Sequence, residues 1–339
     1  MVILGGTSFT IGENIVTIDE TTSYNLSDYI SEEGADYYVF INADGRVIAS
    51  TIRTPAEGYM FIGQFHTLCR GVGSNTTFLK ADSFGLTVGQ DYKIISYLDN
   101  EDLDFSNFYN KRILAVADTA QYSIITAPHA LAGFNTMDIL PESVWCLNFH
   151  PDCKSWDGMV YCEEKHIAVD IYHNTGNGYQ TESSYGSVPS VNRYWLNYNN
   201  DAQCVKKRLP SVDEWLSFAI GSNNKSVTST KVLISGGHVD STGRRLVSNI
   251  GVEGCEGFVF SLSGNIFCLS DDQAYHIFDG SSGQLGMQES ILGYNSVGSN
   301  WWHNADYDGI RSMGSGKLSD TGITDYYVGI ICVADISIV

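Results

Sequence analysis

Short runs of β-branched and aromatic residues, separated by tight-turn sequences, dominate the first 140 residues. One such run, YYVFI, ends at the sequence Asn42-Ala43-Asp44-Gly45 and is followed by a second run, RVIAS. An Asn/Asp/Gly turn between two runs of this kind is a strong hairpin signal. Strands are expected at residues 37–41, 46–50, 58–65 and 92–97. The pattern predicts a small all-β module over residues 1–140.

The pattern changes after Pro141. Residues 142–149 are a strand candidate, and a turn follows at Asp157-Gly158. Apolar and polar residues then alternate over residues 166–172, as expected for a half-buried strand. Near the C-terminus, the apolar run at residues 326–333 predicts a buried closing strand.

Two helices are expected between these strands. The first is predicted over residues 191–199. The second has a clear start signal, because Ser211 is followed three residues later by Glu214, the spacing of a capping box. Four apolar residues then fall at helical spacing on one face, and Gly221 ends the pattern. These four residues are Val212, Trp215, Leu216 and Ala219.

Composition and charge narrow the class of protein. Apolar residues make up 43% of the 339 residues, which is enough for a packed core, and only 17% are charged. The net charge of −20 repels phosphate backbones and anionic lipids, so nucleic-acid partners and membrane insertion are not expected. The chain has no apolar stretch of membrane-spanning length, and its first residues lack the features of a signal peptide.

Side chains that could carry chemistry are scattered. The eight cysteines form no Cys-x-x-Cys pair, so the common zinc spacings are absent and we expect mostly reduced, buried residues, with one or two disulfides as an open alternative. The histidines show no His-x-x-x-His pair and are expected to be surface or hydrogen-bonded core residues. The acidic run at residues 99–104 lacks the glycine and distal glutamate of an EF-hand, so a solvated loop is expected there. No cofactor is expected, and structural calcium stays open.

The sharpest local motif is KRLPSVDEW at residues 207–215. It resembles the start of the second helix in the formylglycine-generating-enzyme branch of C-type-lectin folds. That motif alone fits an enzyme and a binding protein equally well. The enzymes of this branch use a pair of cysteines near the end of the fold to bind copper, whereas only Cys332 lies in that region here.

Further motifs, in the same order along the chain, favour a binding protein. They lie at residues 36–65, 142–149, 157–159, 168–172, 252–260 and 327–333. Together they resemble the variable proteins of diversity-generating retroelements, the phage tropism determinants among them. The resemblance implies an α+β chain in which a C-type-lectin-like domain, residues 141–339, follows an all-β, sandwich-like module. Two departures are a shorter stretch before Gly34 and the Phe258-Val259-Phe260 sequence in place of a Trp-rich inner strand.

In that family, error-prone copying at template adenines rewrites selected codons. The segment at residues 293–308 fits this process because ten of its residues are encoded within one adenine substitution of the codon AAC. These are Tyr294, Asn295, Ser296, Ser299, Asn300, His303, Asn304, Asp306, Tyr307 and Asp308. Adjacent Trp301 and Trp302 need another codon or a fixed origin.

This segment has the chemistry of a binding surface. Tyr and Trp provide large and fairly rigid contact area, and Ser and Asn provide adaptable hydrogen bonds, as in antibody loops. The alternative is an ordinary polar loop, against which Trp301 and Trp302 argue because two large aromatics are seldom left without a partner. The resemblance adds Ser312, Asp325 and Tyr327, so the expected variable region is residues 293–327, although Tyr327 fits a core position equally well.

The sequence therefore predicts a binding protein and not an enzyme. The resemblance implies a viral receptor-binding protein at the virion surface, such as a tail-fibre tip, that contacts a host-cell surface macromolecule, with protein as the expected class. A homo-oligomer would multiply a moderate affinity. Two alternatives stay open, namely a metal-dependent oxidase of the formylglycine-generating type and a host-encoded surface adhesin.

Overall fold

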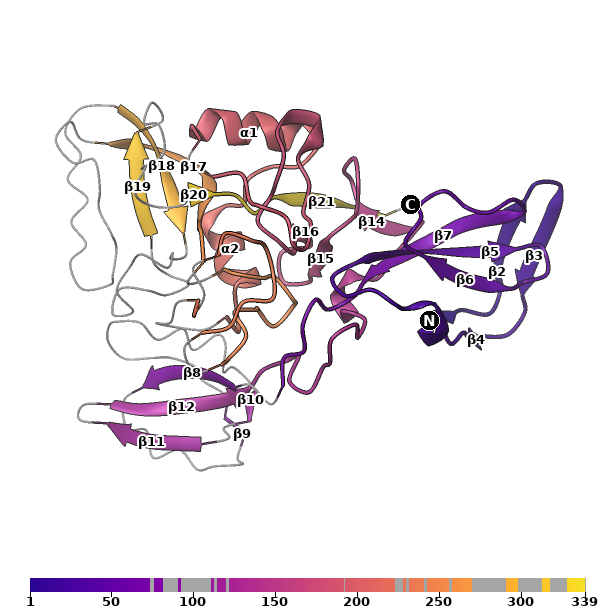
Figure 1. Cartoon of the computed structure of the whole chain (residues 1–339), viewed down its shortest axis with the longest axis horizontal. Coiled ribbons are helices and arrows are strands. Elements are labelled where there is room, and N and C mark those ends of the chain that lie inside the picture. Colours follow the sequence, from indigo (N-terminus) through magenta and orange to yellow (C-terminus); the bar gives the residue numbers. More distant parts are fainter. Residues whose placement is uncertain are drawn as a thin grey trace.

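The computed structural model shows a chain that is mostly β-sheet with few helices (Figure 1). It describes residues 1–73, 76–81, 91–92, 111–112, 115–119, 122–191, 193–222, 228–229, 232–240, 243–255, 258–269, 291–297, 313–317 and 328–338. For residues 76–128, 260, 265–269, 291–297, 313–317 and 328, that description covers the backbone alone. Within the described residues, no helix combines the length and apolar character needed to span a bilayer.

One eight-stranded sheet joins the first part of the chain to the last, in the order β15-β16-β21-β14-β13-β7-β5-β6. Its strands are β5 (Asp36–Asn42), β6 (Val47–Ser50), β7 (Tyr59–His66), β13 (Trp145–Cys146), β14 (Phe149–Pro151), β15 (Met159–Cys162), β16 (Ile167–Asp170) and β21 (Val333–Ile338). The connection across the two parts is the antiparallel pairing of Trp145 with Gln64 and Cys146 with Gly63.

The hairpin predicted near the N-terminus is confirmed in β5 and β6. At the turn, the Asn42 side-chain oxygen accepts hydrogen bonds from the backbone N–H groups of Asp44 and Arg46. Gly45 has a φ of 76°, a left-handed conformation that favours glycine. In the same module, β2 (Thr7–Ile11) pairs with β3 (Asn14–Ile18), and β1 (Val2–Ile3) pairs with β4 (Thr22–Ser23).

A second small sheet is inserted between β7 and β13. Its strands are β8 (Thr76–Ala81), β11 (Ala115–Thr119) and β12 (Tyr122–Pro128), beside the pair β9 (Asp91–Tyr92) and β10 (Lys111–Arg112). The chain enters and leaves through a hydrogen-bonded stem, in which the Gly133 N–H donates to the Gly73 carbonyl at 2.5 Å. Only Tyr92 of the strand expected at residues 92–97 lies in a described strand, and the acidic run at residues 99–104 lies outside the described residues.

The single strand predicted at residues 142–149 is wrong. The chain forms a 3₁₀ turn, η3 (Pro141–Ser143), and then the two short strands β13 and β14. Pro141 begins that turn, and Cys146 pairs with Phe149, so the two residues between them form a tight connection. The next predicted strand begins one residue late, at Ile167, because His166 has a φ of 53° that no extended strand allows.

Both predicted helices exist, and the first is displaced. Helix α1 is Trp195–Cys204 and not residues 191–199, since the Ser190 N–H still donates to the Asn174 carbonyl and the backbone of Tyr194 is extended. Helix α2 is Val212–Phe218, and its capping box is confirmed because Ser211 and Glu214 bond each other's backbone N–H groups. Trp215 and Ala219 are buried, and the partly buried Val212 and Leu216 pack on the same core.

The predicted closing strand is in fact two strands in different sheets. β20 (Val328–Gly329) pairs with β17 (Phe260–Leu269), whereas β21 pairs with β14 and β16. Between β20 and β21, the backbone N–H groups donate to side chains and not to a neighbouring strand. The Ile331 N–H donates to Ser261 Oγ at 2.9 Å, and the Cys332 N–H donates to Asn174 Oδ1 at 3.1 Å. The run from Ile330 to Val333 is buried, as expected.

Candidate functional site

The candidate variable region is built on a four-stranded sheet with the order β19-β18-β17-β20 (Figure 1). The added strands are β18 (Ile291–Val297) and β19 (Met313–Lys317). β18 is antiparallel to β17 and β19, and β20 is parallel to β17. β17, β19 and β20 therefore begin at the end of the sheet where β18 finishes.

One row of paired residues crosses the sheet at this end, and we call it the terminal row. Met313 pairs with Val297, Val297 with Ser261, and Ser261 with Gly329. The chain leaves the terminal row after Val297 and returns to it at Met313. Residues 298–312 are thus joined to the sheet through two directly paired positions.

The other connections of this sheet can also be assigned to one of its two ends. β20 begins at the same end of the sheet, and Asp325 and Tyr327 precede it in the sequence. The connection at residues 270–290 instead joins the opposite end of the sheet, where Leu269 pairs with Ile291. The backbone thus separates the connection with the expected binding chemistry from the connection without it.

Three of the predicted site residues lie in the described part of the chain. Tyr294, Asn295 and Ser296 lie in β18, opposite Gly316, Ser315 and Gly314 of β19. The remaining predicted site residues lie outside the described residues, namely Ser299, Asn300, Trp301, Trp302, His303, Asn304, Asp306, Tyr307, Asp308, Ser312, Asp325 and Tyr327. For these twelve, the structure gives the point of attachment to the sheet.

Buried contacts hold the terminal row in place. The Phe258 ring, just before β17, lies edge-on to His173 at 5.5 Å and against His238 at 4.2 Å between ring centroids. Burial lowers the pKa of His173 to about 3, so this imidazole is neutral at pH 7. Gly329 is closely packed, because an added Cβ would lie 3.1 Å from the Ser190 carbonyl oxygen and could be accommodated only if that segment shifted. The end of the sheet is therefore a fixed platform.

Helix α1 supports β17 further along. Leu262 belongs to a buried cluster with Trp195, Tyr198, Ala202, Leu209, Ile330 and Cys332. The Trp195 indole N–H donates to the Ser263 carbonyl at 2.9 Å, and the Gly264 N–H donates to the Pro210 carbonyl at 2.7 Å. The KRLP segment thus packs directly behind the strand that carries the terminal row.

The KRLPSVDEW motif is structural in this chain. Lys207 Nζ lies 2.5 Å from Asp170 Oδ1, and both side chains are buried. Burial is the largest single influence on the pKa of Lys207 and lowers it, but the neighbouring Asp170 carboxylate, together with Cys153 and Cys332, raises this pKa above its usual value, so the ammonium stays charged. Arg208 makes two hydrogen bonds to Glu214, at 2.8 and 2.6 Å, beside the capping box. The motif joins α2 to the strands of the large sheet.

The cysteines follow the prediction in part. Cys69, Cys162 and Cys332 are buried free thiols and Cys255 is also buried, but Cys146 is exposed, and Cys153 and Cys204 are half-buried. Burial raises the pKa of the Cys332 thiol well above its usual range, so this thiol is protonated at neutral pH. Among the described residues, no group of three or more His, Cys, Asp or Glu side chains is placed to hold a metal ion.

Sequence reasoning missed a buried polar network between the first module and the rest of the chain. His66 Nδ1 lies 2.9 Å from Asp36 Oδ1, and His66 Nε2 lies 3.1 Å from the Tyr172 hydroxyl. Cys69 Sγ donates to Glu253 Oε1 at 3.2 Å, and Glu253 also pairs with the buried Arg245. The partners are far apart in sequence, so no local spacing could have shown the network.

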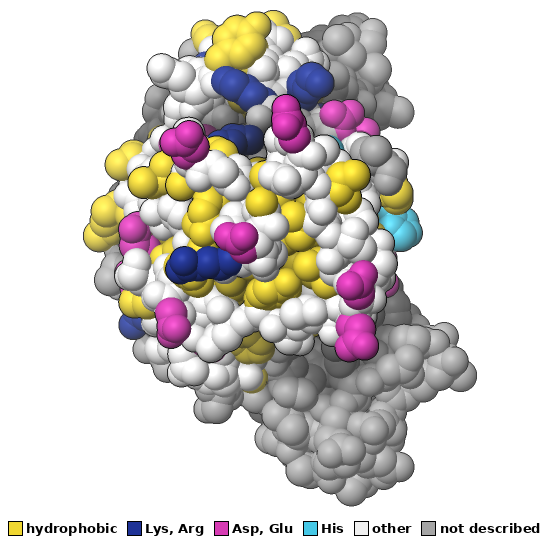
Figure 2. Space-filling view, turned by 90° about the vertical axis from the view of Figure 1, so that its right-hand side faces the viewer, with side chains coloured by type: hydrophobic (Ala, Val, Ile, Leu, Met, Phe, Trp, Pro, Cys, Tyr) yellow, Lys and Arg dark blue, Asp and Glu magenta, His cyan; other side chains and the backbone are white. Residues whose placement is uncertain are grey.

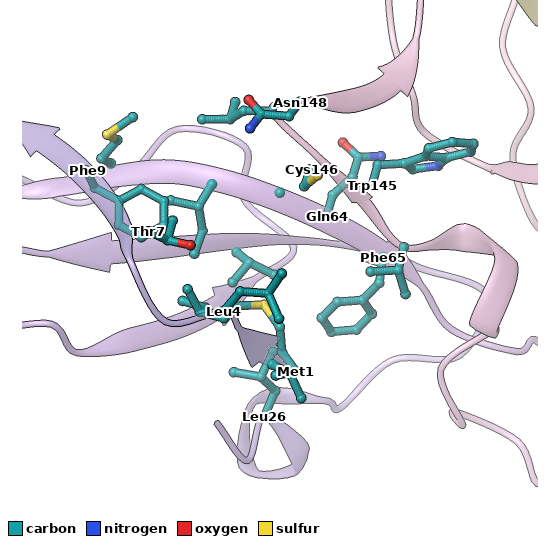
Figure 3. Close-up of a pocket in the computed structure, with 18 of the residues that line it drawn as sticks. Met1, Leu4, Thr7, Phe9, Leu26, Gln64, Phe65, Trp145, Cys146 and Asn148 are labelled. Carbon is teal, nitrogen blue, oxygen red and sulfur yellow. The ribbon is translucent and has the colours of Figure 1, made fainter. Parts of the chain in front are cut away.

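Sequence reasoning also missed a mostly apolar cavity of about 680 Å³ in the N-terminal module. Figure 3 shows Met1, Leu4, Leu26 and Phe65 around its space, with Gln64 and Cys146 on the side of β13. Figure 2 shows hydrophobic side chains gathered across the middle of the face that this module turns outward. Val2, Leu4 and Val144, which line the cavity, are each at least half exposed.

Comparison with solved structures shows the fold. The Major Tropism Determinant M1 variant matches with a TM-score of 0.66 and 15% identity, covering 100% of this chain and 81% of that chain. The I1 variant gives a TM-score of 0.66 and the U1 variant 0.64, each at 16% identity and with the same coverage. The chain has the fold of the Major Tropism Determinants.

The resemblance predicted from the sequence is thereby confirmed in the structure, including its C-type-lectin-like fold. No protein-family model matches the chain, and no curated protein matches its sequence. The shared architecture is therefore visible in three dimensions where overall sequence similarity is too low to show it.

Proposed function

We propose that this protein is a receptor-binding protein whose contact surface is formed by residues 293–327 at the terminal row. The observation that carries this proposal is the register of Met313, Val297, Ser261 and Gly329, to which the Trp-containing connection and the residues before β20 are both joined. The similarity to proteins named for tropism supports the same function.

In this proposal, the residues that support the surface are distinct from the residues that contact the ligand. Residues behind the terminal row, such as Leu262 and Ile330, are buried and fix the platform. Residues 298–312 span two adjacent paired positions, so their sequence can change without altering strand register. We propose that a retroelement rewrites the adenine-derived positions in this segment, which would change ligand choice while the core stays constant.

The proposed partner is a protein on a host-cell surface. Tyr, Trp, Ser and Asn side chains are the types that recur in adaptable protein-binding loops. The net charge of −20 disfavours a nucleic-acid partner. We place the protein at the virion surface, at a tail-fibre tip or its equivalent, by analogy with the tropism determinants.

We further propose that several copies assemble through the N-terminal module. The apolar cavity and the exposed side chains of Val2, Leu4 and Val144 support this, because a second copy would remove them from water. Several copies on one particle would also turn a moderate affinity into firm attachment.

A segment-replacement experiment tests the proposed surface. Residues 298–312 are replaced by a Gly/Ser segment of equal length, and binding of the labelled protein to host cells is measured by flow cytometry. The matched control replaces residues 271–289, which connect the opposite end of the same sheet. Binding lost only with the first replacement is the expected result, while binding retained there and lost with the second would place the surface at the other end.

Two other functions are separated by independent measurements. A metal-dependent oxidase would contain a stoichiometric redox metal, which elemental analysis of the purified chain detects. A host-encoded adhesin would have its gene beside cellular genes and not among virion genes. The buried Cys332 thiol favours the receptor-binding proposal over the oxidase.

A further inference from the structure

A lysine, an aspartate and an asparagine meet in the interior, where the segment between α1 and α2 passes β16 and the crossing from β20 to β21 (Figure 1). Lys207 Nζ lies 2.5 Å from Asp170 Oδ1, and Asn174 Nδ2 donates to Asp170 Oδ2 at 2.7 Å. One carboxylate therefore holds an amine on one of its oxygens and a side-chain amide on the other.

Water has almost no access to these three groups. The side chain of Lys207 is 4% exposed, that of Asp170 is 0% exposed, and Asn174 as a whole residue is 1% exposed. In water, a lysine amine does not attack an amide, because the amine is protonated and strongly hydrated. In a dry interior the charged amine loses that hydration, and attack of water on the amide is suppressed as well.

The backbone near the C-terminus orients the amide of Asn174. Its Oδ1 atom accepts a hydrogen bond from the Cys332 N–H at 3.1 Å, and its own backbone N–H donates to the Ile330 carbonyl at 2.9 Å. A donor on the amide oxygen draws charge away from the amide carbon and would stabilise the negative oxygen that forms when a nucleophile attacks that carbon.

The same stretch of backbone positions the other two residues. The Asp170 N–H donates to the Cys332 carbonyl at 2.9 Å. Arg208, directly after Lys207, forms two backbone hydrogen bonds with Val333, each at 2.9 Å. The amine, the carboxylate and the amide are therefore held together before any reaction, which removes most of the entropic cost of bringing them into contact.

We propose that Lys207 and Asn174 form a spontaneous isopeptide bond between Lys207 Nζ and Asn174 Cγ, with Asp170 as the group that moves the protons. The bond would join the segment before α2 to the segment after β16. A covalent link between two segments restricts the unfolded chain and so stabilises the fold. This modification does not depend on the proposed receptor-binding surface.

The reaction balances without any further reactant. Asp170 first takes one proton from the Lys207 ammonium, and burial raises the pKa of this carboxyl, so it can hold the proton. The neutral amine attacks Asn174 Cγ, and a second proton passes from the attacking nitrogen through Asp170 to Nδ2. The Cγ–Nδ2 bond then breaks, and ammonia leaves. The ion pair of Lys207 and Asp170 is the arrangement before the bond forms.

Mass spectrometry of the full chain, after overnight incubation and under denaturing conditions, tests the proposal. The chain should be lighter than its sequence by one ammonia, about 17 Da. Trypsin does not cleave after an acylated lysine, so the digest should contain peptide 166–193 attached to the dipeptide 207–208. Fragmentation should place the link at Asn174. The absence of the linked peptide would overturn the proposal, as would a link at Asp170 with loss of water. Ammonia lost without attachment of the dipeptide would also overturn it, because a succinimide at Asn174 gives that result.

Three variants test the roles of the residues. Asn174→Ala removes the carbon that is attacked, and Asp170→Asn keeps the side-chain size and removes the proton relay. Both should lack the linked peptide, with circular dichroism as the check of folding. Lys206→Met, at an exposed lysine 4.0 Å from Asp152, is the matched control and should contain it. A linked peptide in a folded Asp170→Asn chain would overturn the role of Asp170. If neither variant folds, the digest of the unmodified chain still decides whether the bond exists.

Discussion

Lys207 Nζ and Asp170 Oδ1 form a 2.5 Å ion pair in the interior, between the KRLP segment and strand β16. The Asp170 Oδ2 atom also accepts a hydrogen bond from Asn174 at 2.7 Å. Asn174 reaches on to the Cys332 backbone, so the pair stabilises the point where the chain crosses from β20 to β21. The same motif therefore fixes both α2 and the end of the sheet that carries the candidate site.

Breaking this pair should be costly. Lys207→Met leaves the Asp170 carboxylate buried without its counter-ion, and we expect a loss of about 3–5 kcal/mol in the free energy of unfolding. Urea unfolding followed by circular dichroism measures it. The matched control is Lys206→Met, at an exposed lysine 4.0 Å from Asp152, where the change should stay below about 1 kcal/mol. Equal effects at the two positions would contradict the structural role of the pair.

The capping box should contribute measurably to α2. Ser211→Ala removes the acceptor for the Glu214 N–H, so a loss of about 1 kcal/mol is expected in the same urea assay. Ser217→Ala, inside the helix, is the comparison and should change stability by less than about 0.5 kcal/mol. A Ser211 variant as stable as the original chain would argue against the cap.

Two glycines with similar backbone angles should respond differently to alanine. Gly158 has a φ of 59°, and an added Cβ would lie 2.4 Å from the Ser183 carbonyl oxygen. Gly186 has a φ of 73° and open space around it. We expect Gly186→Ala to cost about 1–2 kcal/mol from backbone strain alone and Gly158→Ala clearly more. Thermal melting of both variants measures the difference, and an equal cost would contradict the close packing at Gly158.

Stability should fall in acid because of His173. Burial lowers its folded-state pKa to about 3, well below the ordinary value of 6.5, so the unfolded chain binds the proton first. The contribution is fully present above pH 6.5 and is lost as the pH falls toward 3, by on the order of 3–5 kcal/mol. Urea unfolding at several pH values measures the free energy of unfolding, which should fall less steeply with decreasing pH in His173→Gln than in the original chain. Between pH 7 and 8, the free energy of unfolding should depend on pH equally in the two proteins, which serves as the internal control. An equally steep fall in acid for both proteins would contradict this assignment.

Self-association should depend on the apolar face of the N-terminal module. Val144→Asp puts a charge beside the apolar cavity, and we expect it to dissociate the oligomer in analytical ultracentrifugation. Val188→Asp is the matched control, at a valine that is also exposed but lies away from this cavity. An unmodified chain that sediments as a monomer would contradict the assembly proposal.

Local signals in the sequence predicted local structure well. The Asn42–Gly45 turn and the Ser211–Glu214 spacing each depend on residues a few positions apart, and both formed as expected. The strand expected at residues 142–149 failed because apolar character alone does not show that Pro141 starts a turn or that Cys146 and Phe149 pair with each other.

Contacts between residues far apart in the sequence could not be predicted from such local signals. The apolar run near the C-terminus contributes to two sheets because Ser261 and Asn174, distant in sequence, take its backbone donors. The pairing of His66 with Tyr172 likewise joins residues 106 positions apart. The candidate site was inferred from residue types, whereas its common attachment at one sheet end required the strand register.

Sequencing the 3′ end of this gene across a natural population tests the central claim most directly. The account predicts substitutions at adenine-derived codons that are concentrated in residues 293–327, mainly in the connection from Val297 to Met313. Leu262 and Ile330, buried behind the terminal row, should stay constant. Substitutions that are spread evenly, or that gather at residues 270–290 on the opposite end of the sheet, would contradict a diversified binding surface at the terminal row.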